Sequence, residues 1–147
     1  MDTSEARNIA VVRRYFDGCN SGNLDELLST LAPDVVHYFL PKSFPTIRGA
    51  MDLARFWQKY QNVLDPVWRI DEIIGRGDHV VSEWSCLWKP VGKTSQIMSR
   101  GTEWYILRNG LIGEIRAYFG AERLVEIDTE LADFSYSERG YLTREGA

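Results

Sequence analysis

The chain has 147 residues, of which 44% are apolar and 12% aromatic, so it can bury the core of one compact domain without disulfide or metal support. Its formal net charge is −4 and its basic residues are scattered, which argues against nucleic acid or an anionic membrane as a partner. Cys19 and Cys86 are far apart and form no CxxC motif, which is typical of buried thiols in a reducing compartment, so we expect a cytoplasmic protein.

The N-terminal part of the sequence predicts three helices and one strand. Apolar residues at helical spacing, preceded by a capping sequence, predict a first helix from Ser4 to Asn20. A short second helix is expected from Leu24 to Leu31, closed by Pro33, and a third from Ala50 to Val63. Between them, the segment from Val35 to Leu40 is rich in residues that favour a strand.

From residue 66 onward the pattern changes to strands. Two strands are expected from Val67 to Gly75 and from His79 to Lys89, and a long hairpin from Ser95 to Phe119. The Asn109-Gly110 pair in this hairpin is typical of a tight type I′ turn. Helices therefore come first and a four-stranded antiparallel meander last, which indicates an α+β fold.

The organisation of the chain is simple. No repeat or low-complexity tract interrupts it, so we expect one domain over residues 1–147, with residues 121–147 as a C-terminal tail. The first residues lack the basic and apolar regions of a signal peptide, and there is no run of about 18 apolar residues that would span a membrane.

The order of three sequence segments resembles a known superfamily. RRYFDGCNSGNLDELLSTLAPDVV is followed by IRG, a helix, and finally GEIRAYFG, as in the nuclear-transport-factor-2-like superfamily. Its SnoaL-like and ketosteroid-isomerase-like enzyme branch also includes scytalone dehydratase and limonene epoxide hydrolase. The resemblance covers roughly residues 4 to 125 and implies a cone, in which a curved antiparallel sheet wraps three helices around a deep apolar pocket. Because this scaffold hosts many chemistries, the pocket residues have to carry the functional argument.

Strand alternation sorts the side chains into two faces, and the resemblance implies which face is inside. The residues expected to face the pocket are Trp84, Cys86, Trp88, Glu103, Tyr105, Ala117 and Phe119. The residues expected to form an ion-pair lattice on the outer face are Glu83, Arg100, Glu114 and Arg116.

Three side chains are candidate catalytic residues: Glu103, His37 and Tyr15. The resemblance to ketosteroid isomerase aligns Tyr15 and Glu103 with the tyrosine and the acid that donate hydrogen bonds to a developing enolate oxygen. The carboxylate base of that family is missing near Phe39. His37, two residues away on the same face, is the candidate base, since an imidazole with a pKa of about 6.5 accepts protons at neutral pH.

Each candidate also has a structural interpretation. Glu103 could face outward and pair with Arg100 or Arg116. Tyr15 could be a core residue whose hydroxyl group caps a neighbour, and His37 a buried structural histidine.

The aromatic residues indicate the ligand. The candidate substrate-binding residues are Phe39, Trp57, Trp84, Cys86, Trp88, Tyr105 and Phe119. We therefore expect a lyase or isomerase of aromatic compound metabolism, which acts without a cofactor or metal on a hydrophobic aromatic or polycyclic molecule. The alternatives are a non-catalytic binding or interaction domain, and a hydrolase, cyclase or dehydratase of the same scaffold.

Two further expectations concern the surface. Trp104, Ile106 and Tyr118 on the outer face of the sheet predict a homodimer. Aromatic residues in the tail, including Phe134 and Tyr141, predict that it packs over the mouth of the pocket.

Overall fold

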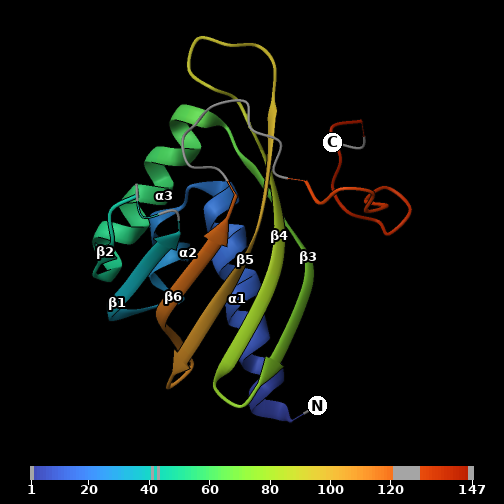
Figure 1. The fold of residues 1–147 in the computed structure, drawn as a ribbon. Helices are drawn as coiled ribbons and strands as arrows, with labels where there is room; N and C mark the ends of the chain where they lie inside the picture. Colours follow the sequence, from blue (N-terminus) through green and yellow to red (C-terminus); the bar gives the residue numbers. More distant parts are fainter. Residues whose placement is uncertain (1, 41, 43, 121–129, 146–147) are drawn as a thin grey trace.

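The computed structural model describes residues 2–40, 42, 44–120 and 130–145. Among these residues the chain forms helices and strands in the following order: α1 (Thr3–Ser21), α2 (Leu24–Leu28), β1 (Leu31–Leu40), β2 (Ile47–Arg48), α3 (Ala50–Leu64), β3 (Val67–Arg76), β4 (His79–Trp88), β5 (Ile97–Arg108) and β6 (Leu111–Phe119). Figure 1 shows one curved, unclosed sheet with the helices gathered on one side of it. The predicted α+β fold class is confirmed.

The sheet is larger than the predicted meander. Its strand order is β2-β1-β6-β5-β4-β3, and β1 pairs with β6 in parallel while the other neighbours are antiparallel. The second helix ends at Leu28, and Pro33 lies inside β1 instead of closing a helix. The register between β1 and β6 shifts between Leu31 and Val36, and such an irregularity is where a strand tolerates proline.

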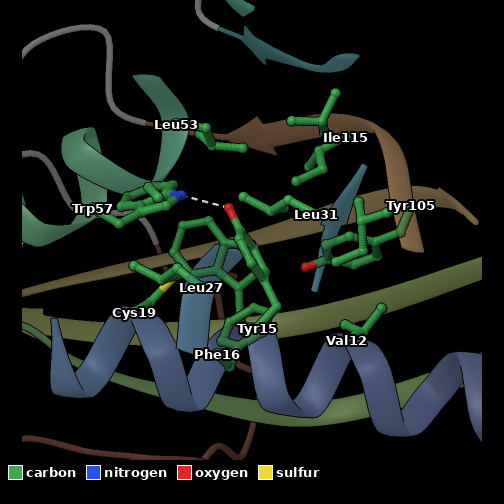
Figure 2. Packing of buried hydrophobic residues seen from close by; sticks show 14 of the residues in the cluster. Val12, Tyr15, Phe16, Cys19, Leu27, Leu31, Leu53, Trp57, Tyr105 and Ile115 are labelled. Carbon is green, nitrogen blue, oxygen red and sulfur yellow. Dashed lines mark hydrogen bonds between the residues drawn. The ribbon is translucent and has the colours of Figure 1, made fainter. Parts of the chain in front are cut away.

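Helix α1 places Tyr15 in the interior. Asp2 and Glu5 form a capping box at its start, and Gly22 ends it with a positive φ of 68°. The buried face of the helix includes Tyr15 and Phe16, which pack against the inner side of the sheet (Figure 2).

The β5–β6 hairpin places Glu103 in the middle of the sheet. Asn109 and Gly110 both have positive φ, 50° and 77°, as the predicted tight turn requires. Glu103 pairs with Ser82 of β4 on one side and with Ala117 of β6 on the other. Its side chain therefore lies over the centre of the inner face, far from a sheet edge.

Residues 130–145 lie against the outer face of the sheet. The Arg69 guanidinium donates to the Gly140 carbonyl at 2.9 Å, and Tyr141 donates a short hydrogen bond to Glu83. Leu142 completes a small apolar cluster with Leu87 and Met98. This placement differs from the expected cover over the pocket mouth; residues 121–129 lie outside the described part of the chain. Within the described residues, no helix has the length and apolarity needed to span a membrane.

Candidate functional site

An aromatic pocket lies between the inner face of the sheet and the helices. Six of the seven predicted substrate-binding residues line it: Phe39, Trp57, Trp84, Cys86, Trp88 and Phe119. The space between its walls measures about 540 Å³, including the part open to solvent. The cavity itself is much smaller, about 40 Å³, so a ligand of drug size fits only if the aromatic side chains of the walls move apart. No described residue of the tail lines this pocket.

Glu103 is the carboxyl group in the pocket wall. Its side chain is only 4% exposed, and burial raises its pKa from 4.5 to about 7, because a charged carboxylate loses hydration there. The Tyr105 hydroxyl donates to Glu103 Oε2 at 2.6 Å, which favours the charged form and opposes part of that rise. Both protonation states are therefore populated near neutral pH.

Glu103 does not have the outer-face partner that the structural interpretation requires. Arg100 contacts Ser85 Oγ at 2.5 Å and Glu130 Oε1 at 2.8 Å, beneath the tail. Arg116 instead bonds Glu114 at 2.6 Å on the outer face. The carboxyl group of Glu103 thus faces the pocket and accepts a hydrogen bond from the Tyr105 hydroxyl group.

Tyr15 lies one layer behind the pocket wall. It is 1% exposed, and its hydroxyl oxygen accepts a hydrogen bond of 2.5 Å from Trp57 Nε1. Figure 2 shows this contact joining α1 to α3. Burial, together with the nearby Cys19 and Glu103, raises the pKa of Tyr15, so the phenol is neutral at physiological pH.

His37 is fully buried, and the pocket-lining residues do not include it. Its ring stacks on Phe39 with a centroid separation of 4.0 Å and lies 5.8 Å from the Trp57 ring. Burial lowers its pKa from 6.5 to about 3, so the imidazole is neutral at pH 7 and accepts a proton only weakly. Neither ring nitrogen has a side-chain or backbone acceptor or donor within the described residues that satisfies hydrogen-bond geometry.

Tyr105 has a different position from the one expected. It is fully buried behind Glu103 and does not line the pocket. Its hydroxyl group contacts Ser82 Oγ at 2.9 Å in addition to Glu103, so it holds the carboxyl instead of a ligand.

Ala117 lines the pocket as expected, but several other lining residues were missed from the sequence: Phe44, Phe56, Tyr60, Trp68 and Ser99. Strand pairing could have identified Trp68, because it lies directly opposite Cys86 on the adjacent strand. The i and i+4 positions of Phe56 and Tyr60 on α3 are the corresponding helical signal.

The thiol and acidic groups give no metal or nucleophile site in the described residues. Burial raises the pKa of the Cys86 thiol, so it is protonated and a poor nucleophile. Within the described ranges, no group of three or more His, Cys, Asp or Glu side chains is arranged to hold a metal ion.

Solved structures with the same fold share much of the chain. A protein of unknown function with a cystatin-like fold from Methylobium petroleophilum PM1 is 30% identical, with 95% of this chain and 93% of that chain covered and a TM-score of 0.71. An epoxide hydrolase of the LEH-like type from M. tuberculosis is 20% identical over 80% and 85% of the two chains, with a TM-score of 0.70. A putative ketosteroid isomerase from Kribbella flavida DSM 17836 is 22% identical over 82% and 83%, with a TM-score of 0.68.

The last two likenesses show the fold alone, which is the cone of nuclear-transport-factor-2-like proteins. Among curated protein sequences, none matches this chain. The family model of the SnoaL-like domain matches residues 12–115, which is well over half of the sequence. The chain therefore belongs to the SnoaL-like domain family.

Proposed function

We propose that the chain is a cofactor-independent acid–base enzyme, a lyase or an isomerase, that acts on a hydrophobic aromatic or polycyclic small molecule. The observation that supports this proposal most strongly is a carboxyl group, Glu103, with a pKa of about 7 in the wall of an aromatic pocket. A group with this pKa can both accept and donate a proton at neutral pH.

The proposed step is an isomerisation through an enolate. The Glu103 carboxylate takes a proton from a carbon next to a carbonyl group, and the electron pair of the broken C–H bond moves into the enolate. The protonated Glu103 then delivers the proton to another carbon of the enolate, so no co-reactant is needed. An elimination would begin with the same proton removal and end with loss of a leaving group.

The surrounding residues have supporting parts in this proposal. The aromatic walls exclude water and hold a planar anion. Tyr15 lies close enough for the charge of Glu103 to contribute to its raised pKa, and its neutral hydroxyl group can stabilise negative charge near that carboxyl.

The geometry supports a smaller part for His37 than the sequence predicts. A buried imidazole with a pKa of about 3 is a weak proton acceptor at pH 7. We therefore assign proton removal to Glu103, and the variant His37→Gln separates the two assignments. If His37 removes the substrate proton, this variant loses activity as completely as Glu103→Gln.

Proton exchange tests the proposal directly. Aromatic ketones and diaryl alcohols are incubated with the protein in deuterated water, and NMR follows deuterium entering the carbon next to the functional group. We expect Glu103→Gln to slow exchange by about 10²-fold or more, since general acid–base groups contribute that much. The matched control is Glu114→Gln on the outer face, where the carboxyl pairs with Arg116. Exchange that survives Glu103→Gln combined with His37→Gln would exclude this mechanism.

Hydrolases and cyclases of the same scaffold are a weaker alternative. By the resemblance, the acidic and basic groups of those mechanisms fall where this chain has Trp84, Cys86 and Ala117. All three residues line the pocket, and none of them can replace an ionised carboxylate.

A non-catalytic binding domain is the second candidate function. The close packing of the aromatic walls favours it, because the rings of Phe56 and Trp57 lie 4.9 Å apart and those of Trp68 and Trp84 lie 5.0 Å apart. Under this interpretation Trp84→Ala abolishes ligand binding, whereas Glu103→Gln leaves binding unchanged and stabilises the fold by removing a costly buried charge.

We also propose that the chain forms a homodimer through its outer sheet face. Trp104 is 40% exposed and Tyr118 is 44% exposed, which is unusual for large aromatic side chains in a monomer. A charge at the first position, Trp104→Glu, should shift the mass in light scattering to the monomer value of 16.9 kDa. A wild-type protein that is monomeric at micromolar concentration would contradict this part of the proposal.

A further inference from the structure

Four tryptophan side chains line the pocket, and their indole N–H groups fall into two classes. Trp57 donates to the Tyr15 hydroxyl oxygen at 2.5 Å, and Trp88 donates to Ser99 Oγ at 2.9 Å. The Nε1 atoms of Trp68 and Trp84 are buried without a hydrogen-bond partner in the described part of the chain. The residues that the structure describes therefore supply acceptors for two of the indoles and none for the other two.

The two unpartnered indoles are neighbours. The ring centroids of Trp68 and Trp84 are 5.0 Å apart, with the ring planes inclined by 69°. A buried donor without an acceptor is costly, and two such donors on neighbouring side chains are rare in native structures. An acceptor atom on a bound molecule would remove this cost.

The backbone makes room for the donor edge of Trp84. Gly101 lies opposite Trp84 on β5, and a Cβ at Gly101 would be only 2.6 Å from Cζ2 of the indole, next to the ring carbon that carries Nε1. The absence of a side chain at Gly101 thus lets the Trp84 ring lie close to the inner face of β5. Glu103 is two residues further along the same face of β5, so the carboxyl group and the indole are diagonal neighbours.

The chemistry of the pocket limits the charge of the molecule that fits. Its described lining contains no Lys, Arg or His side chain, so nothing there would compensate a carboxylate or phosphate group. Apart from Glu103, the polar groups are hydroxyl, thiol and indole groups, all of which can donate a hydrogen bond. The walls are otherwise aromatic, which favours a flat ligand.

We infer that the indole N–H groups of Trp68 and Trp84 form a subsite for a carbonyl oxygen, which makes an uncharged, flat aromatic ketone the preferred class of ligand. This inference deepens the proposed function, since the subsite lies in the same pocket as Glu103. The subsite selects the ligand by its acceptor oxygen, while the carboxyl group carries the proton chemistry.

The test compares two ligands that differ only in the carbonyl group, 9-fluorenone and fluorene. Equilibrium dialysis gives the ratio of their dissociation constants, corrected for their partition between water and octanol. We expect the wild type to prefer fluorenone, and we expect Trp68→Phe and Trp84→Phe each to reduce the ratio by about 3- to 10-fold, the worth of one hydrogen bond. The matched control is Trp88→Phe, whose N–H already bonds Ser99, so its loss should leave the ratio nearly unchanged.

A measurement on the unaltered protein covers the case in which a variant fails to fold. Fluorenone should move the ¹⁵N–¹H indole signals of Trp68 and Trp84 downfield while that of Trp57, already bonded to Tyr15, stays in place. The inference is overturned if fluorenone binds no better than fluorene, including the case that neither binds, or if Trp88→Phe lowers the ratio as much as the other two variants. The fluorenone test measures binding alone. If the protein prefers fluorenone to fluorene as expected but catalyses no proton exchange, the proposed function is rejected and the carbonyl subsite stands.

Discussion

Tyr105 donates a hydrogen bond of 2.6 Å to Oε2 of Glu103, from a position two residues further along the same face of β5. Burial favours the neutral acid, whereas this hydrogen bond favours the carboxylate. The balance of the two effects gives Glu103 a pKa of about 7. The two-residue spacing of Glu103 and Tyr105 on β5 therefore helps to set the protonation state of Glu103, the candidate catalytic group.

Removing the donor should raise the pKa of Glu103. In Tyr105→Phe the ring stays in the core but the carboxylate loses its hydrogen bond, so the pKa should rise by roughly one to two units, because a bond to a charged group contributes about 1.5–3 kcal/mol. Infrared titration of the carboxyl band gives the value. The control is Ser82→Ala, which removes a partner of Tyr105 only and should change the pKa less. A pKa that stays constant or falls in Tyr105→Phe would show that the hydroxyl group does not stabilise the charge.

The stability of the protein should depend on pH through Glu103. Its pKa is about 7 in the folded state, above the ordinary value of 4.5, so its contribution to stability is greatest below pH 4.5 and is lost as the pH rises to about 7. The loss should amount to about 3 kcal/mol, since one pKa unit is worth about 1.4 kcal/mol. Urea unfolding of wild type and Glu103→Gln between pH 4.5 and 8 measures it. If the free energy of unfolding changes equally with pH in the two proteins, Glu103 is exposed or already charged.

His37 should act in the opposite direction. Its pKa is about 3 in the folded state and 6.5 ordinarily, so its contribution to stability is complete above pH 6.5 and is lost as the pH falls toward 3. In His37→Leu no buried nitrogen has to be protonated on unfolding, so the acid limb of the stability curve should flatten and the midpoint of acid unfolding should fall. An unchanged acid limb would place the imidazole in contact with water. Full activity in this variant would also show that His37 does not carry the proton.

The tail should stabilise the sheet without contributing to the pocket. Leu142 is 6% exposed and packs with Leu87 and Met98 on the outer face. Truncation after Glu130 exposes this cluster and should lower the free energy of unfolding by about 2 kcal/mol or more, the value of one buried leucine side chain. Affinity for fluorenone should stay the same, because no described tail residue lines the pocket. Lost affinity with unchanged stability would instead support a tail that covers the ligand.

Local patterns predicted most of the secondary structure. Helical spacing located α1 and α3 within a residue or two of their observed ends, and the Asn109-Gly110 pair located the β5–β6 turn. These features depend on neighbours in sequence, so the sequence reports them well. The parallel pairing of β1 with β6 depends on residues about 80 positions apart, such as His37 and Ile115, and no local pattern encodes it.

The candidate site was predictable to a smaller extent. The resemblance implied that Glu103 and six other strand residues face the inside, and the structure places all of them except Tyr105 in the pocket wall. It could not reveal that Tyr15 meets Trp57, or that His37 is buried beside Trp57, because both contacts join different elements. The pKa of His37 follows from that burial, so a histidine assigned as a base from sequence has a neutral ring in the fold.

The most direct test of this account is the titration of Glu103 in the wild-type protein. Carbon-13 labelling of glutamate side chains, with Glu103→Gln used to assign the signal, follows the carboxyl chemical shift from pH 3 to pH 9. Because the group is buried beside Tyr105 in an aromatic pocket, the midpoint should lie near 7. A midpoint near the ordinary value of 4.5 would contradict the account, since Glu103 would then not be a carboxyl group whose pKa is raised by burial in the pocket wall.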